Sequence, residues 1–168
     1  RLTMSEPLSF FTIASPIGTL YALTDSRALF YLGYRSDDAR HYASHHRLTV
    51  KTAESPLTAP LRQELSAYFA GHLRQFTLPL ELLGTPFQLS VWQALSAIPY
   101  GRTASYKDIA LAIKNPQASR AVGGANHHNP ISIIIPCHRV IRADGQVGGY
   151  GGGLARKEYL LSLEHRLG

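Results

Sequence analysis

The residues with the clearest chemical potential in this sequence lie side by side at Cys137, His138 and Arg139. Cys137 is the only cysteine of the chain, and neighbouring cations favour the thiolate, which is the nucleophilic form of the side chain. Successive residues of a strand point to opposite faces, so the thiol and the imidazole meet only where the chain bends, and Pro136 favours a bend there. The pattern predicts a nucleophilic cysteine with an adjacent base. The alternative is an inert cysteine that packs as a small core residue.

An acid that holds the histidine would complete such a site. Glu158, in the first turns of the last predicted helix (about 154–165), is the acid that we expect to orient His138 in a nucleophile–base–acid chain. The alternative for Glu158 is a favourable charge near a helix N-terminus. The glycine-rich segment "GQVGGYGGG" at 145–153 lacks the lysine and the spacing of a phosphate-binding loop, so we expect it to form a pocket wall around Tyr150.

The sequence does not favour metal chemistry. His41, His45 and His46 recur at helical spacing, but no further ligands accompany them, and a solvated helix face explains them better than a metal site. A single cysteine can form neither an internal disulfide nor a cysteine-rich zinc site. We therefore expect no metal and a reducing, cytoplasmic location.

Length and charge narrow the class of protein. The chain has 168 residues, 45% of them hydrophobic, which is enough for one large core or two small ones. It has no run of about 18 apolar residues that would predict a membrane span. The N-terminus has no secretory pattern, and Met4 is a candidate natural start. The net charge of +6 is concentrated in residues 85–168, where nine Arg and Lys accompany four Asp and Glu. A basic half suits a polyanion such as nucleic acid, although ordinary solubility charge would look the same.

Turn signals and hydrophobic patterning divide the chain into two predicted domains. In residues 1–84, three short strands over 9–34 suggest an antiparallel meander, followed by helices at 36–47 and 59–72. Residues 73–85 are irregular and contain Pro and Gly, which is typical of a linker. The sequence therefore predicts a small α/β domain with an antiparallel sheet at the N-terminus.

Residues 85–168 are predicted to be mostly helical. Thr85 caps a helix that has Pro86 at its first position, and Ser105 caps a second helix that extends to 115. A third helix over 116–128 follows after a break of about two residues, which is the helix-turn-helix pattern. An apolar strand at 131–135 then leads into the cysteine.

The third predicted helix is rich in small residues. Gly123 and Gly124 each cost about 1 kcal/mol relative to Ala inside a helix, so we expect them to let DNA phosphates or a packed partner approach the backbone. Arg120 is the one long side chain at the N-terminal end of this helix. It is either a DNA contact or an ordinary surface arginine.

Five ordered segments of the second half resemble one known family. They are "TPFQLSVWQAL" at 85–95, "SY" at 105–106, "SRAVGGANHHNP" at 119–130, "PCHRV" at 136–140 and "GGLARKEYLL" at 152–161. Together they resemble the O6-alkylguanine-DNA alkyltransferases, which are also called methylated-DNA–protein-cysteine methyltransferases. The resemblance is strong over residues 85–168 and looser before them. It implies a ribonuclease-H-like N-terminal domain and a winged-helix-like C-terminal domain.

The resemblance implies direct-reversal DNA repair without a cofactor. The helix-turn-helix of a monomer would enter the minor groove of double-stranded DNA that contains O6-alkylguanine. The damaged guanine would be flipped into a pocket, with Arg120 taking its place in the stack, and the alkyl group would pass irreversibly to Cys137. The DNA-contacting positions implied beside Arg120 are Ser119, Ala121, Gly123, Gly124 and Ala125.

The resemblance also implies roles around the thiol. His138 corresponds to the histidine that deprotonates the cysteine through a water, with Glu158 as the acid that holds it. Asn129 corresponds to the asparagine that braces the active-site turn and contacts the thiol, and Tyr106 to the tyrosine that donates a proton toward guanine N3. The implied pocket consists of Val140, whose carbonyl would read the base amine, Pro136, Tyr150 and Gly151.

Two other functions are consistent with the same residues. A DNA-binding module could flag alkyl lesions without reacting, with an inert cysteine, and a thiolate hydrolase could use Cys137 with turnover. Transfer to an sp³ carbon needs a strong, soft nucleophile, so the alkyltransferase reading predicts a thiol pKa that is lowered through His138. A thioether does not hydrolyse, so each molecule should react once.

Overall fold

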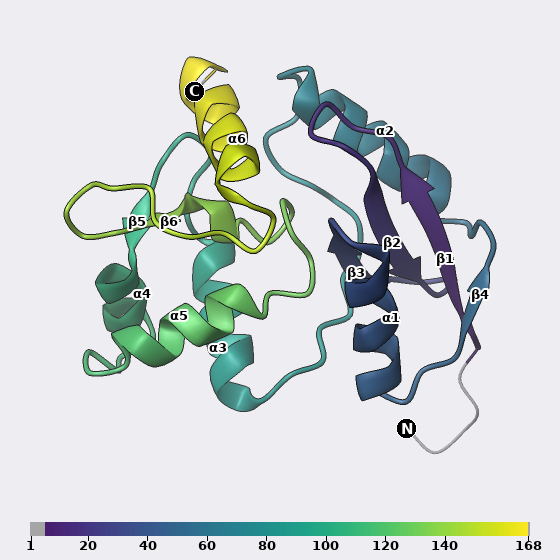
Figure 1. Cartoon of the computed structure of the whole chain (residues 1–168), viewed down its shortest axis with the longest axis horizontal. Coiled ribbons are helices and arrows are strands. Elements are labelled where there is room, and N and C mark those ends of the chain that lie inside the picture. The colour runs from purple at the N-terminus through teal and green to yellow at the C-terminus, as the bar shows by residue number, and fades with distance from the viewer. Residues whose placement is uncertain (1–5, 168) are drawn as a thin grey trace. The chain divides into compact units, whose positions relative to one another are not determined.

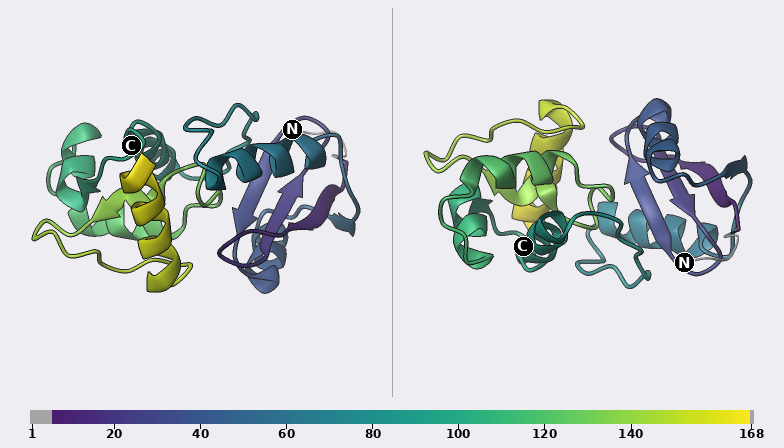
Figure 2. Two further views of the ribbon diagram at one scale, coloured as in Figure 1. Left: turned by 90° about the horizontal axis from the view of Figure 1, so that it is seen from above. Right: turned by 90° about the horizontal axis from the view of Figure 1, so that it is seen from below.

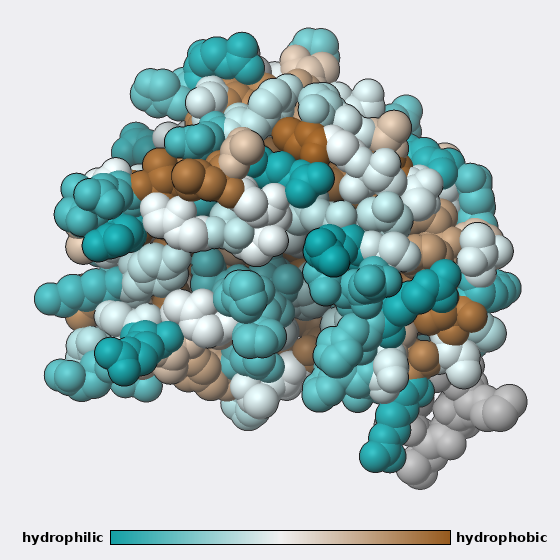
Figure 3. All heavy atoms as spheres, viewed as in Figure 1, coloured by the Kyte–Doolittle hydropathy of each residue, from teal (hydrophilic) through white to brown (hydrophobic). Residues whose placement is uncertain are grey.

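The computed structural model describes residues 6–167, and the candidate start at Met4 lies outside them. The chain forms two compact units, Arg1–Leu83 and Gly84–Gly168 (Figure 1). Among the described residues, no helix is long and apolar enough to cross a membrane. On the face drawn in Figure 3, apolar side chains lie in small separate patches among polar ones.

The N-terminal unit is built on a four-stranded sheet with the order β3-β2-β1-β4. Strands β1 (Leu8–Ile13), β2 (Leu20–Thr24) and β3 (Leu29–Gly33) form the antiparallel meander that the alternating pattern predicts. Strand β4 (Val50–Thr52) pairs in parallel with β1, so the sheet is mixed and not purely antiparallel. Its three residues are too few to show an alternating pattern, and the sequence analysis missed it for that reason.

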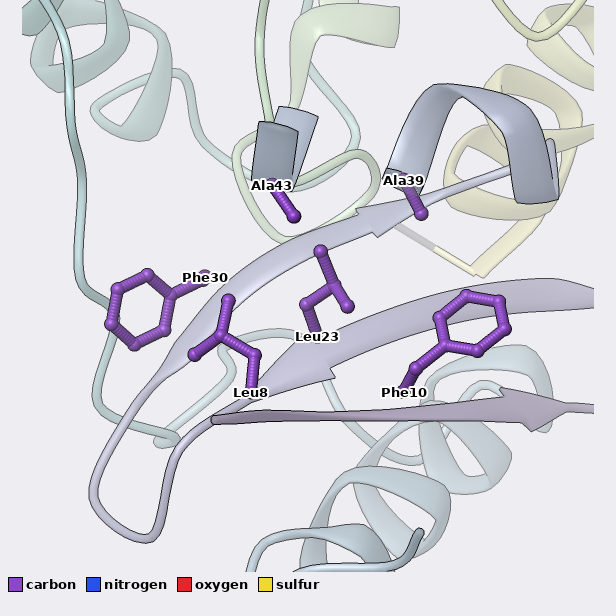
Figure 4. Packing of buried hydrophobic residues seen from close by; sticks show 6 residues of the cluster. All are labelled: Leu8, Phe10, Leu23, Phe30, Ala39 and Ala43. Atoms are coloured by element: carbon purple, nitrogen blue, oxygen red, sulfur yellow. The ribbon is translucent and has the colours of Figure 1, made fainter. Parts of the chain in front are cut away.

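The two helices of this unit cover opposite faces of the sheet (Figure 2). They are α1 (Ser36–His45) and α2 (Thr58–Phe69), at the two predicted places. The core beneath α1 joins side chains from β1, β2 and β3 to two alanines of the helix (Figure 4). After α2, the predicted linker is partly tied to the sheet, because the Glu81 amide donates a 2.9 Å hydrogen bond to the Leu29 carbonyl.

Three packed helices open the C-terminal unit: α3 (Pro86–Ser96), α4 (Tyr106–Ala112) and α5 (Ser119–His127). The predicted caps are confirmed, since the Thr85 hydroxyl accepts from the Gln88 amide and the Ser105 hydroxyl accepts from the Asp108 amide. Both form complete capping boxes, which satisfy amides that a helix start leaves unpaired.

The link between α4 and α5 is longer than the sequence predicts. Helix α4 ends before Lys114, whose φ of 60° is left-handed. The Ala118 amide then donates to the Asn115 carbonyl, closing a turn with Pro116 at its second position. Proline suits that position of a turn as well as it suits a helix start, so the sequence alone placed the start of the third helix three residues too early.

The predicted strand at 131–135 is wrong. Apart from an isolated bridge at Ile131, this segment consists of turns, and it leads into the 3-10 helix η1 (Cys137–Arg139). The strand β6 (Val140–Ile141) follows and pairs in parallel with β5 (Ala104–Ser105). The last helix, α6 (Leu154–Leu167), packs against η1. The apolar run marks burial correctly, but tight turns can bury isoleucines as a strand does.

Candidate active site

Two three-residue turns bend the chain sharply before the cysteine. The Ile134 amide donates a 2.8 Å hydrogen bond to the Ser132 carbonyl around Ile133, whose φ is 73°. The Cys137 amide donates a 2.8 Å bond to the Ile135 carbonyl around Pro136, with φ −82° and ψ 64°. The first turn is of the rare left-handed kind, which a β-branched residue adopts only when its surroundings enforce it.

Asn129 supplies part of that enforcement. Its Nδ2 donates to the Ile135 carbonyl at 2.8 Å, and its Oδ1 accepts from the Ile131 amide at 3.0 Å. The same side chain also hydrogen-bonds Cys137. One amide group therefore bridges both ends of the turn and contacts the thiol, as the resemblance implies.

Cys137 is 5% exposed, and burial raises the pKa of its thiol. Hydrogen bonds from Asn129 and Tyr150 and the charge of Lys157 lower the pKa again, but by less. The expectation of a lowered thiol pKa is therefore wrong for the free protein. Loss of hydration outweighs the polar contacts, so the thiol keeps its proton at neutral pH until a base removes it.

His138 is fully buried and paired with Glu164. The Nε2 atom of His138 lies 2.8 Å from Oε2 of Glu164, and Arg139 donates to the same carboxylate through Nε at 2.8 Å and Nη2 at 3.0 Å. Burial alone would raise the pKa of Glu164, but the hydrogen bonds and charges of His138 and Arg139 lower it to about 2.

The ionised carboxylate determines the tautomer of the histidine. Since Glu164 can only accept, Nε2 of His138 carries the hydrogen, and the neutral ring has its lone pair at Nδ1. Burial lowers the pKa of His138, which keeps the ring neutral near pH 7. Nδ1 has no hydrogen-bond partner among the residues that the structure describes, so it is available as a base.

The assignment of Glu158 is corrected by this pair. Glu158 is exposed on α6, whereas Glu164 is buried. Lys157, Leu160, Leu163 and Glu164 form the buried stripe of the helix, at spacings of three, six and seven residues. Glu158 lies about 100° around the axis from Lys157 and misses this stripe. The expectation for Glu158 took it as the acid nearest to the site and as the family's matching acid, although the apolar period of α6 indicates that Glu164 lies on the buried face.

Tyr106 is the first residue of α4 and lies close to α5. A Cβ atom built on Gly123 would lie 3.9 Å from its ring. Burial raises the pKa of the Tyr106 hydroxyl, and the nearby Cys137 raises it further. The phenol therefore stays protonated and can donate a hydrogen bond.

Helix α5 presents a narrow face of small residues. Arg120, Ala121 and Gly124 are exposed, and Ser119 and Gly123 are half-buried. Ala125 is a correction, because it is buried and its carbonyl accepts a 2.9 Å bond from Nε1 of Trp92. Its side chain packs in the core and is not on the exposed face.

The predicted pocket residues gather around η1 and the loop before α6. Pro136 and Val140 are buried, Tyr150 is half-buried and hydrogen-bonds the thiol, and Gly151 is exposed. A Cβ atom on Gly151 would lie 4.0 Å from the ring of His127, at the end of α5. The residue that the sequence analysis missed is Lys157, which is fully buried beneath this loop.

The described residues contain no group of three His, Cys, Asp or Glu side chains that could hold a metal ion. The site is instead a buried thiol beside a base–acid pair, in a unit that carries a helix-turn-helix. These features define a protein in which a buried cysteine, a base–acid pair and a helix-turn-helix belong to one folded unit.

Comparison with known proteins gives the family. Residues 86–166 match the model of the "6-O-methylguanine DNA methyltransferase, DNA binding domain", and residues 9–82 match that of its "ribonuclease-like domain". The methylated-DNA–protein-cysteine methyltransferase of Mycolicibacterium paratuberculosis is 48% identical over 159 residues, covering 95% of this chain and 93% of that protein. The Methanosarcina barkeri protein of the same name is 59% identical over 152 residues, covering 90% and 94%.

Solved structures agree with the sequence relatives. The crystal structure of Mycobacterium tuberculosis OGT in complex with DNA superimposes with a TM-score of 0.83 at 45% identity, covering 95% of this chain and 94% of that one. The chain belongs to the 6-O-methylguanine DNA methyltransferase family. The resemblance and the fold class inferred from the sequence are thereby confirmed.

Proposed function

We propose that this chain repairs duplex DNA by moving an alkyl group from guanine O6 to the sulfur of Cys137, once per molecule. The observation that carries this is the placement of Cys137: its buried thiol is hydrogen-bonded by Asn129 and Tyr150 within the unit that bears the helix-turn-helix. Relatives that cover nearly the whole chain are named for this reaction, and a similar structure was solved with DNA.

The free protein holds a thiol, so the reaction needs a base. Nδ1 of His138 accepts the thiol proton, through a water, while Glu164 holds the other side of the ring and stabilises the imidazolium that forms. Glu164 takes the role that the sequence analysis gave to Glu158. Storing the thiol protonated also protects the only cysteine from adventitious oxidation before substrate arrives.

The transfer itself is a displacement at carbon. The thiolate forms a sulfur–carbon bond as the bond from that carbon to O6 breaks, and the electron pair moves onto the purine. The Tyr106 phenol, kept protonated by its raised pKa, donates toward N3 and neutralises the leaving guanine. The thioether product has no route back to the thiol, which limits each molecule to one transfer.

The exposed face of α5 supports a role in holding the DNA. Arg120 stands at the start of the helix, where its cation can reach phosphates or replace a flipped base. Ala121 and Gly124 leave the helix backbone open to close approach. A narrow helix of this kind suits the minor groove, which is roughly 6 Å wide.

The site also bears on the organisation and location of the protein. Every residue assigned to the reaction lies in residues 85–168, so we assign catalysis and DNA binding to this unit and a supporting role to residues 1–84. Repair by a monomer is sufficient, because no site residue is needed from a second copy. A single acceptor thiol that must stay reduced suits the cytoplasm.

The deciding experiment is intact mass spectrometry after incubation with a short duplex that carries one O6-methylguanine. We expect one added methyl group per protein, located on the Cys137 peptide by peptide mapping, even with excess DNA. Cys137→Ser should bind the same duplex without gaining mass, because a hydroxyl is a poor nucleophile here. Tight lesion binding with no mass gain in the native protein would favour a lesion-flagging module, and repeated turnover would favour a hydrolase.

A further inference from the structure

Lys157 is a fully buried lysine that lies between the thiol and the loop before α6. Its Nζ donates to the carbonyls of Val140 at 2.7 Å, Val147 at 2.6 Å and Gly149 at 3.0 Å. An ammonium has three donors and no acceptor, so these three carbonyls satisfy it completely and identify the charged form. The buried lysine therefore holds three backbone carbonyls from two segments of the chain together.

The charge of Lys157 lacks a carboxylate partner. Within the described part of the chain, Nζ forms no ion pair with Asp or Glu, and burial lowers the pKa of the ammonium. An ionised Cys137 would favour the ammonium, and the ammonium in turn favours the thiolate over the thiol. Burying an ammonium without a carboxylate is costly, so the arrangement calls for a functional explanation.

The three carbonyls belong to segments that the substrate would meet. Val140 begins β6 directly after η1, and Val147 and Gly149 belong to the loop that carries Tyr150. Gly148 lies between the two loop carbonyls with a φ of 76°, and a Cβ atom there would be 3.9 Å from Nζ. The Lys157 ammonium thus links the start of β6, which follows Cys137 in the chain, to the 147–149 segment of the loop that carries Tyr150.

We propose that Lys157 is a positioning residue that fixes the Val140 carbonyl and the 147–149 loop around the flipped base and that supplies the counter-charge of the Cys137 thiolate. The proposal rests on the function proposed above and on the role that the family resemblance implies for Val140, whose carbonyl would accept from the 2-amino group of guanine. A carbonyl oxygen has two lone pairs, so Val140 can accept from Lys157 and from the base together. The hydrogen bond from the ammonium fixes the direction of the Val140 carbonyl and leaves its second lone pair free for the base.

The first test measures the thiol. In Lys157→Met the unbranched apolar stem is kept but the ammonium group is lost, so the pH profile of single-turnover methyl transfer should move upward by about one unit. Alkylation of Cys137 by iodoacetamide should show the same upward shift without DNA. Lys157→Gln, which is neutral but retains two donors, should show the shift as well. If Lys157→Met and Lys157→Gln fold but keep the native pH profiles of transfer and alkylation, Lys157 does not act as the counter-charge of the thiolate.

The second test measures base reading. O6-methylhypoxanthine in the same duplex lacks the 2-amino group, so its transfer should not depend on the alignment of Val140. At the pH optimum of each protein, we expect Lys157→Met to slow methyl transfer from O6-methylguanine at least about fivefold more than transfer from O6-methylhypoxanthine. Equal slowing of the two substrates would overturn the positioning of Val140.

Matched controls separate these effects from general damage. Lys51→Met makes the same change at an exposed lysine of the N-terminal unit and should leave both profiles unchanged. Rates are expressed per active molecule, from the amplitude of the single-turnover reaction. If neither neutral variant folds, the test is made on the native protein by NMR of its lysine ammonium groups. The Lys157 resonance is assigned as the one that is lost in Lys157→Arg. This resonance should shift as pH rises through the ionisation of Cys137 in the unmethylated protein and should not show that shift in the methylated protein. The same pH dependence in both forms would overturn the coupling.

Failure of this inference can be told from failure of the proposed function. Native protein that does not methylate Cys137 from the O6-methylguanine duplex contradicts the function itself. Native protein that does so, alongside Lys157→Met with native pH profile and native base preference, contradicts only the role of Lys157.

Discussion

The Nε2 atom of His138 and the Oε2 atom of Glu164 lie 2.8 Å apart, although 26 residues separate them in the chain. Both side chains are buried, and Arg139 closes the group by binding the same carboxylate. This contact ties η1 to α6 and leaves Nδ1 of the ring as the basic nitrogen. The buried charges of Arg139 and Glu164 compensate each other, so His138 can remain neutral until it takes a proton.

Replacing Glu164 should therefore impair both transfer and folding. Glu164→Gln removes the charge that stabilises the imidazolium and leaves Arg139 buried with a neutral partner. We expect methyl transfer to slow about 100-fold and stability to fall by about 3 kcal/mol. Single-turnover kinetics and urea unfolding measure the two effects. Glu158→Gln is the matched control on the same helix, and a larger loss of transfer there would restore the original assignment of the acid.

Acid should destabilise the protein in two stages. The pKa of His138 is lowered by burial, so the unfolded chain binds this proton more readily, and stability falls as pH drops below about 6.5. The pKa of Glu164 in the folded protein is about 2, against an ordinary value of 4.5, so a second loss follows as pH falls from 4.5 toward 2. Urea unfolding across this range checks both stages. Glu164→Gln should lack the second stage. If the native protein and Glu164→Gln lose stability identically as pH falls from 4.5 toward 2, the pairing of Glu164 with His138 and Arg139 is contradicted.

The parts of the site that were predictable from sequence depend on local interactions. The caps at Thr85 and Ser105 involve residues three apart, and the meander of β1, β2 and β3 follows from alternation and turns. Asn129, Cys137 and His138 were indicated by the resemblance, whose segments at 119–130 and 136–140 contain them. Such features do not require knowledge of how distant segments pack.

The errors concern packing between distant segments. Glu164 meets His138 only because α6 returns across η1, and the acid nearer the helix start points away. Ile131, Ile133 and Ile135 are buried as alternate residues of a strand would be, and the bonds of Asn129 and the left-handed Ile133 distinguish a turn from a strand. Lys157 was overlooked because its partners are backbone carbonyls, which leave no mark in the sequence.

Gly124 offers a test of why α5 keeps glycine on its exposed face. A Cβ atom there would meet nothing within 4 Å, and its φ is not left-handed, so the fold does not require glycine. Gly124→Ala should stabilise the protein by about 1 kcal/mol through helix propensity. It should also weaken duplex binding about tenfold, since the methyl group would lie against DNA. Thermal unfolding and fluorescence anisotropy measure the two effects, and stabilisation with native affinity would remove Gly124 from the interface.

Arg120 can be tested by separating base flipping from chemistry. It is exposed at the second position of α5, and it is absent from the hydrogen bonds and ion pairs found among the described residues, so its removal should leave the fold intact. In Arg120→Ala, transfer from an O6-methylguanine duplex should fall about tenfold or more, because the flipped state loses the side chain that fills the stack. Transfer from free O6-methylguanine base should stay within about twofold, since the base needs no flipping. Lys107→Ala, an exposed cation on α4, controls for the loss of one positive charge. Equal losses on duplex and free base in Arg120→Ala would show that this residue supports the site in another way.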